Sequence, residues 1–202
     1  MSDANAVNQR RKYIDDEQWE RTSPSWKELV PLRDFDHWSE TNETPEQMAE
    51  RLGHAGFSIP LLVIAQWLYP HYYTSETVDN YGWLDYRRIA FSIATLSVSD
   101  LKQLHVIQGY RGYVQMRASS KPYGDFACKP EDLAYWQSHG TWRVPPIMLD
   151  VKSLPPIPSH AEIRSSLQLV EGHSRLGYLL ALDAAGMLTV QDHTVFMMVY
   201  EK

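Results

Sequence analysis

The sequence predicts an α+β protein in which a helical N-terminal region is followed by a small mixed α/β domain. Helix-start signals and helical apolar spacing dominate residues 1–108, whereas residues 109–202 contain short apolar or alternating runs separated by loops. A chain of 202 residues is long enough for one large domain or two small ones. We therefore place a boundary near Gly109 and expect one domain on each side of it.

Paired signals for the start of a helix recur through the first half of the chain. Residues 13–21 fit a short helix, and Ser23, followed directly by proline, is typical of a helix cap and first position. Thr44 is also followed by proline, and Gln47 stands where a capping box needs a side-chain acceptor. We expect that helix to end at Gly53.

Four further segments complete the N-terminal region. Residues 59–69 are apolar almost all round, which predicts a helix in the core that Pro70 ends. Residues 71–82 are polar and aromatic and are expected to form a loop. The apolar spacing over residues 84–96 predicts another helix, and a capped short helix is expected over residues 99–106. The first half of the chain is therefore expected to be all helical.

The C-terminal region changes to short strands between helices. Residues 113–117 alternate as a strand does. Gly140 and Gly186 each follow a helical pattern and are expected to end it. The elements expected in order are a strand over 113–117, a helix that starts at 129, strands over 147–149 and 167–170, a helix over 176–185 and a strand over 194–200.

The composition bounds the compartment and the class of partner. A formal net charge of -6 argues against a protein that coats nucleic acid through bulk charge. Cys128 is the single cysteine of the sequence, so neither an internal disulfide nor a cysteine-based zinc cluster is expected. Residues 1–10 are polar, which predicts a frayed tail rather than a signal peptide, and residues 59–69 are too few to span a bilayer. We expect a cytoplasmic protein with no membrane partner.

The segment Glu171-Gly172-His173-Ser174-Arg175 joins a predicted strand to a predicted helix. Such a junction directs free backbone N–H groups and the positive end of the helix dipole to one place. Gly172 allows a ligand to approach the backbone closely, Ser174 offers a hydroxyl and Arg175 a planar fork for phosphate oxygens. His173 and Glu171 could exchange a proton near neutral pH. The motif predicts a phosphate site at 172, 174 and 175 with catalytic residues at 171 and 173.

Other charged residues bear on this interpretation. Arg111, Arg117 and Lys121 lie around the first strand expected in the α/β domain, and one of them could reach a phosphate. The plainer interpretation is that Gly172 only shapes a turn and that Arg175 only pairs with Glu171 or Asp183. The sequence leaves both interpretations open.

The motif resembles the signature of the ParB/sulfiredoxin superfamily, in which an apolar strand, an acidic or small residue, Gly-X-X-Arg and a helix follow one another. It is most similar to the D-G-H-x-R form of the serine kinases in that group. The Pro-Ile strand over residues 144–149 and the strand over residues 194–199 also match, so the resemblance covers the C-terminal domain. His173 stands where the sulfiredoxins have their cysteine, so their sulfur chemistry is not expected here.

The resemblance implies a nucleotide-binding protein that holds ATP, ADP or CTP together with magnesium. Phosphates would lie against Gly172 and the amides that follow it, while Arg175 would neutralise their charge. Glu171 or His173 would then activate a hydroxyl or a water molecule, which makes a phosphotransferase or a nucleotide hydrolase the expected class of enzyme.

Two other classes of function stay open. The chain could be a non-catalytic interaction or regulatory protein, associated with a toxin or a mobile element, that binds its partner through the aromatic residues of the helical half. The same aromatic residues could instead form the core of that half, which is the interpretation we favour. A DNA-acting nuclease or adaptor of the ParB type is third, because the chain is acidic and has no helix-turn-helix after the α/β domain. The aromatic cluster consists of Tyr69, His71, Tyr72, Tyr73, Tyr81, Trp83 and Tyr86.

Overall fold

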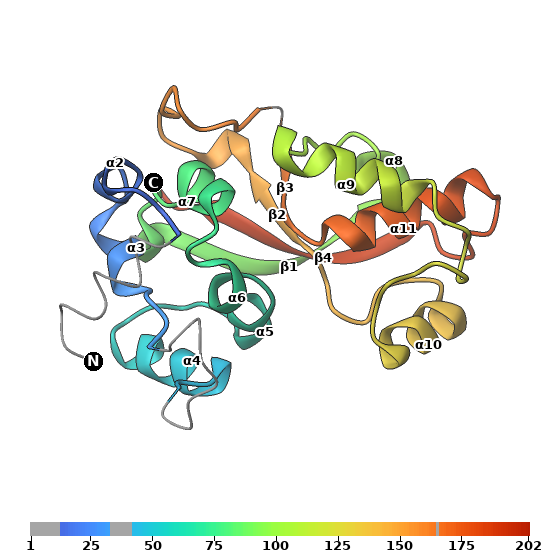
Figure 1. Ribbon diagram of the computed structural model, residues 1–202, viewed down its shortest axis with the longest axis horizontal. Helices are drawn as coiled ribbons and strands as arrows, with labels where there is room; N and C mark the ends of the chain where they lie inside the picture. The colour runs from blue at the N-terminus through green and yellow to red at the C-terminus, as the bar shows by residue number, and fades with distance from the viewer. Residues whose placement is uncertain (1–12, 33–41, 165) are drawn as a thin grey trace. The chain divides into compact units, whose positions relative to one another are not determined.

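A computed structural model of the chain describes residues 13–32, 42–164 and 166–202 (Figure 1). It is an α+β structure whose sheet has four strands in the order β1-β4-β2-β3. The tail expected over residues 1–10 lies outside the described part of the chain. Among the described residues, no helix has both the length and the apolar character that crossing a membrane requires.

The chain divides into two compact units. The first consists of Met1–Phe91, Pro155–Glu162 and Tyr200–Lys202, and the second of Ser92–Leu154 and Ile163–Val199. Such units do not decide which segments fold independently, so the domain boundary expected near Gly109 stays a prediction.

The first unit is built from short capped helices. Asp15, Ser23 and Thr44 each accept a hydrogen bond from a backbone N–H of the first turn that follows. The capping box expected at Thr44 is confirmed: the Gln47 N–H donates to Thr44 Oγ1 at 3.3 Å, and Gln47 Oε1 accepts from the Thr44 N–H at 2.8 Å. The helical elements are α2 (Asp16–Glu20), α3 (Pro24–Glu28), α4 (Pro45–His54), α5 (Leu61–Val63), the π-helix η1 (Ile64–Leu68), α6 (Tyr69–His71), α7 (Ser75–Tyr81) and the 3-10 turn η2 (Tyr86–Arg88).

The expectation that Pro70 ends its helix is wrong. The helix passes through η1, which ends at Leu68, and continues through Pro70 as α6 to His71. Proline lacks a backbone N–H and its ring crowds the preceding turn. The wider π turn, in which the Tyr69 N–H donates to the carbonyl of Ile64, relieves that crowding.

Four residues of the aromatic cluster lie in the core of the first unit. The ring of Tyr72 stacks on Trp26 with centroids 4.7 Å apart, and its hydroxyl donates to the Trp26 carbonyl at 2.8 Å. The rings of Trp67 and Tyr81 pack edge to face, with their centroids 5.6 Å apart. Tyr73 and Tyr86 are also buried. These four tyrosines therefore stabilise the unit by packing, as the favoured interpretation expected, whereas Tyr69, His71 and Trp83 are half-buried.

Four sequence predictions of secondary structure are wrong. The short helix expected over residues 99–106 is α8 (Val98–Leu101), which Ser97 caps. Residues 84–96 were expected to be helical but form η2 and then β1 (Ile89–Ser97). Residues 113–117 were expected to be a strand but lie inside α9 (Gln108–Ala118), and residues 71–82, expected to be a loop, contain α7. The first half of the chain is therefore not all helical, and the sheet takes its first strand from β1. Short runs have weak intrinsic preferences, which pairing and packing override.

The second unit carries the elements that the sequence predicts best. Gly140 and Gly186 follow α10 and α11 and both have positive φ angles, as expected for residues that end helices. Strand β2 pairs antiparallel with β3 and parallel with β4. The remaining elements are α8 (Val98–Leu101), α10 (Pro130–His139), β2 (Ile147–Asp150), the 3-10 turn η3 (Val151–Ser153), β3 (Leu167–Glu171), α11 (His173–Ala184) and β4 (Asp192–Tyr200).

Packing of α11 against the sheet forms the core of the second unit. Leu179 and Leu182 of α11 are buried together with Met148 of β2 and Leu169 of the edge strand β3. Their burial holds α11 in place directly after β3. The geometry of the turn between β3 and α11 therefore depends on a packed apolar core rather than on loop contacts.

A buried histidine is expected to make the second unit sensitive to acid. His193 is 1% exposed, and its Nδ1 lies 2.8 Å from Thr141 Oγ1. Burial lowers the pKa of His193, although the backbone at Val190 and the carboxylate of Asp192 oppose the shift. The folded state prefers the neutral ring. The contribution of His193 to the free energy of unfolding is therefore fully present above about pH 6.5, the ordinary pKa of histidine, and decreases as the pH falls below that value.

The expected result is that His193→Asn flattens the decline of the free energy of unfolding between pH 8 and pH 5. Urea denaturation at both pH values measures this, and His139→Asn, at an exposed position, controls for the loss of a histidine. An unchanged decline in the His193 variant would place the acid sensitivity elsewhere.

Candidate functional site at the start of helix α11

The predicted motif lies where β3 turns into α11. Gly172 is the single residue between the two elements and has φ 109° and ψ 25°, a region that favours glycine. A Cβ at this position would collide with the Cβ of Pro146, which precedes β2. The turn thus needs glycine both for its backbone angles and for the close approach of the neighbouring chain.

The guanidinium of Arg175 links this turn to the segment before β2 and to the end of β3. Its Nη1 donates to the carbonyl of Val144 at 2.9 Å, and its Nη2 donates to Glu171 Oε1 at 3.4 Å. Burial lowers the pKa of Arg175, and the carboxylates of Glu171 and Asp132 oppose this shift. The guanidinium therefore stabilises the end of β3, and its role as a phosphate ligand stays a prediction.

His173 is buried beside the same carboxylate. Its ring lies 4.2 Å from the ring of Tyr110 in α9, measured between centroids, and its Nδ1 lies 3.9 Å from Glu171 Oε2. Glu171 thus lies between an arginine and a histidine. The catalytic roles expected of Glu171 and His173 stay predictions.

Ser174 of the motif is half-buried and contacts a neighbouring helix. Its Oγ lies 2.8 Å from the hydroxyl of Tyr113, and Arg117 Nη2 donates to that hydroxyl at 3.4 Å. Partial burial raises the pKa of Tyr113, but the hydrogen bonds from Ser174 and Arg117 and the charge of Arg117 outweigh it and lower the pKa overall. Sequence reasoning missed Tyr113 because it placed residues 113–117 in a strand. The helical spacing of Tyr113 and Arg117, four residues apart, is the signal that would have found the pair.

Helices α9 and α11 pack side by side and run in the same direction (Figure 1). Successive contacts along α9 meet successive residues of α11, namely Tyr110 with His173, Tyr113 with Ser174, and Arg117 with the ring of Tyr178 at 6.0 Å. The two helices therefore begin at the same end of the pair. Neither N-terminus has a side-chain cap. Amide donors and the positive ends of two helix dipoles meet there.

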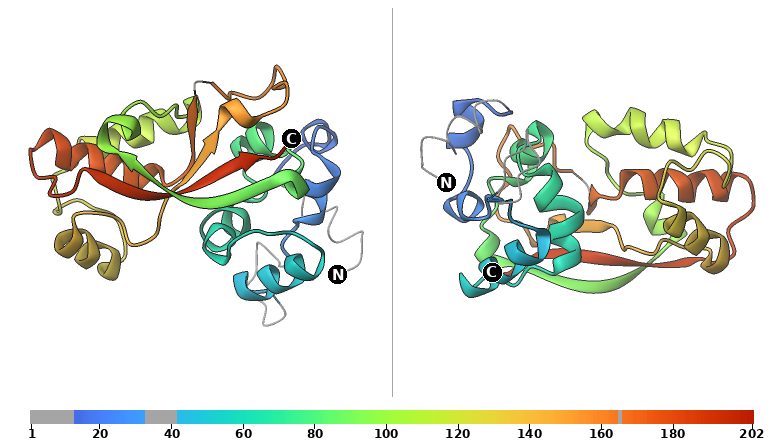
Figure 2. Two further views of the ribbon diagram at one scale, coloured as in Figure 1. Left: turned by 180° about the vertical axis from the view of Figure 1, so that it is seen from behind. Right: turned by 60° about the horizontal axis from the view of Figure 1, so that its bottom comes forward.

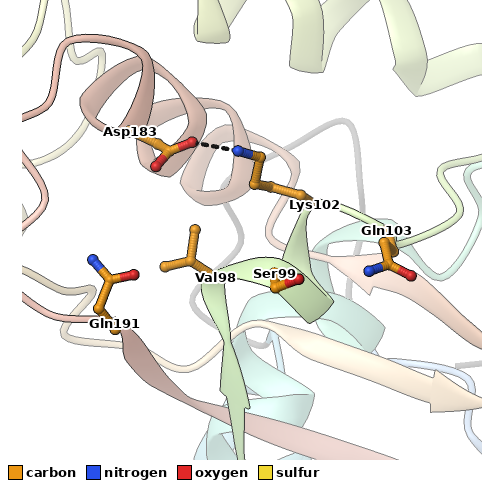
Figure 3. Close-up of a pocket in the computed structure, with 6 residues that line it drawn as sticks. All are labelled: Val98, Ser99, Lys102, Gln103, Asp183 and Gln191. Atoms are coloured by element: carbon orange, nitrogen blue, oxygen red, sulfur yellow. Dashed lines mark hydrogen bonds and ion pairs between the residues drawn. The ribbon is translucent and has the colours of Figure 1, made fainter.

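A polar hollow lies at the opposite end of α11 (Figure 3). Lys102 Nζ and Asp183 Oδ2 are 2.7 Å apart across it, so the two charges neutralise each other. Asp183 belongs to the last turn of α11, whereas the motif lies in the first. The hollow therefore contains no residue of the predicted site. It is lined by Val98, Ser99, Lys102, Gln103, Asp183 and Gln191.

The charged residues named from the sequence fall into two groups. Arg111 and Arg117 both lie on α9. Arg111 Nε donates to the carbonyl of Val106 at 2.8 Å, whereas Arg117 lies in the last turn and reaches Ser174 through the Tyr113 hydroxyl. Lys121 lies beyond the end of α9. Across residues 13–32, 42–164 and 166–202, no three His, Cys, Asp or Glu side chains gather as metal ligands would.

Comparison of the chain with protein-family models, curated proteins and solved structures finds no match.

Proposed function

We propose that the protein binds a phosphate-bearing ligand, with a nucleotide as the first candidate, at the common end of α9 and α11. The observation that carries this proposal is the parallel packing of two helices that both begin without a side-chain cap. Backbone N–H groups at a helix start bind anions well, and two starts at one place add their fields. A phosphate is a suitable ligand because it offers several oxygens to such donors.

The side chains around this end suit an anion in chemistry and position. Ser174 and Tyr113 provide two hydroxyls 2.8 Å apart, and Arg117 supplies positive charge beside them. Arg111 is a second cation on α9, six residues before Arg117. Arg175 serves the site indirectly in this account, because it neutralises Glu171 and so removes a negative charge that would repel phosphate.

A nucleotide with magnesium extends the same proposal. The described residues offer no three-ligand metal group, so a magnesium ion would be held mainly by phosphate oxygens, with Glu171 as the nearest carboxylate of the motif. If the ligand also reacts, as in a phosphotransferase or nucleotide hydrolase, Glu171 and His173 are the residues to receive or donate a proton. This agrees with the resemblance to the ParB/sulfiredoxin superfamily, which stays a hypothesis.

Calorimetric titration with ATP, ADP and CTP in the presence of magnesium tests the proposal. We expect saturable heat with at least one nucleotide. Arg117→Gln should raise the dissociation constant roughly tenfold or more, because a charge-assisted contact is lost. The matched control is Lys121→Gln, which removes the same charge beyond the helix pair.

Two results would contradict the proposal. One is the absence of heat with every nucleotide in protein shown to be folded. The other is an equal weakening by Arg117→Gln and Lys121→Gln, which would indicate attraction by overall charge instead of a site.

A further inference from the structure

Strand β1 forms an open edge of the sheet (Figure 2). It is nine residues long, and its sequence, IAFSIATLS, contains neither a charged residue nor a proline. Exposed edge strands in monomeric proteins are usually short or carry charges, prolines or bulges that prevent pairing with another chain. Strand β1 has none of the sequence features that would prevent it.

The middle of β1 is exposed on both faces of the sheet. Ser92 and Ile93 point to opposite faces, since successive side chains of a strand alternate, and both are exposed. Ile93 has 61% of its surface exposed, more than the other exposed large apolar side chains of the described residues. An apolar side chain at this position is available to contact a partner.

The opposite edge of the sheet, strand β3, is paired with another segment of the chain. At β3, the His105 N–H donates to the Leu167 carbonyl at 3.1 Å, and the Leu169 N–H donates to the His105 carbonyl at 2.9 Å. That segment covers the edge. In the described part of the chain, no such bridge reaches residues 89–96, whose backbone bonds are those of the sheet. The outward N–H and C=O groups of β1 therefore suit one partner above all, another extended backbone.

We propose that two copies of this chain pair through their β1 edges, antiparallel about a two-fold axis near Ile93. The strand is self-complementary in this arrangement, because a pairing centred on Ile93 aligns all nine residues of one copy with those of the other. The two Ile93 side chains would then contact each other across the axis. The result is one continuous sheet shared by two chains.

The charges that flank β1 favour the antiparallel arrangement and a second copy. Arg88 directly precedes the strand and its Nε donates to the Glu201 carbonyl at 2.9 Å. Asp100 lies in α8, three residues after the strand, and accepts from the Ser97 hydroxyl; both charged residues are exposed. Antiparallel pairing brings the basic end of each copy to the acidic end of the other, whereas parallel pairing would bring like charges together. An uncharged strand between opposite charges is therefore complementary to itself.

Light scattering after size exclusion, across a range of protein concentrations, tests the association of the full chain. We expect a species of twice the 23.4 kDa of the chain. Ile93→Lys should raise its dissociation constant roughly tenfold or more, because two like charges would meet at the axis. Ile93→Thr, which keeps a β-branched side chain, should retain the dimer. A monomer at every concentration, or a dimer that Ile93→Lys leaves intact, would overturn the proposal.

Cross-linking tests the direction of pairing independently of affinity. In a Cys128→Ser background, chains with Ser92→Cys and chains with Ala94→Cys are oxidised separately and as a mixture. The antiparallel register places residue 92 of one copy opposite residue 94 of the other, so a disulfide dimer should form in the mixture and not in either chain alone. Cross-linking of each chain to itself without enrichment in the mixture would overturn the antiparallel arrangement. Neither test depends on a nucleotide, so it is distinct from the test of the anion site.

Discussion

Replacing Gly172 with alanine should lower the free energy of unfolding by about 2–4 kcal/mol. Two effects add at this position. The residue has a φ of 109°, which a side chain disfavours, and a Cβ would collide with the Cβ of Pro146. Because the turn positions the first amides of α11, ligand affinity should fall as well. Chemical denaturation measures the first effect and calorimetric titration the second.

Gly186→Ala is the matched control for this substitution. Gly186 also has a positive φ, 64°, but a Cβ there meets no atom within 4 Å. The same substitution should therefore cost about 1–2 kcal/mol from backbone strain alone and leave ligand binding unchanged. Equal losses at Gly172 and Gly186 would show that the contact with Pro146 contributes nothing.

Gly177→Ala should separate α9 from α11. A Cβ at Gly177 would collide with the Cβ of Arg117 and lie 2.9 Å from the carbonyl oxygen of Val114. Overpacking of this kind destabilises by about 1–3 kcal/mol and shifts the backbone. Since the proposed site depends on the two helix starts lying together, we expect weaker ligand binding along with lower stability.

Gly112→Ala on α9 is expected to raise the free energy of unfolding, the opposite of the effect at Gly177. Gly112 lies within α9, and a Cβ there meets no atom within 4 Å. Alanine favours the helix, so the free energy of unfolding should rise by about 0.5–1 kcal/mol. Denaturation of both variants in parallel checks the pair. A stabilising effect at Gly177 would contradict the close packing of the two helices.

The segments nearest the motif were predictable because local signals mark them. Three residues define helix ends through backbone restrictions that act without tertiary contacts: Pro130 at the first position of α10, Gly140 after α10 and Gly186 after α11. The apolar runs of β2 and β3 are short and bounded by loops, so a strand is the structure that fits them. The junction between β3 and α11 follows from the same signals.

The errors concern segments whose structure depends on a distant partner. Ile89 and Ile93 of strand β1 are four residues apart, a spacing that also fits a helix. The pairing of β1 with β4, which lies far along the chain, makes this segment a strand. Residues 113–117 were too few to distinguish the two periods, and packing against α11 makes them helical. Tyr113 and Ser174 are 61 positions apart, so their contact followed from neither segment alone.

Central to this account is an anion site at the common start of α9 and α11, and nuclear magnetic resonance tests it most directly. The ¹⁵N-labelled protein is titrated with ATP and magnesium, and separately with inorganic phosphate, while every backbone amide is followed. The account predicts that the largest shifts fall on the amides of residues 173–175 and 108–110. Shifts confined to other residues, or no shift at saturating ligand, would contradict it.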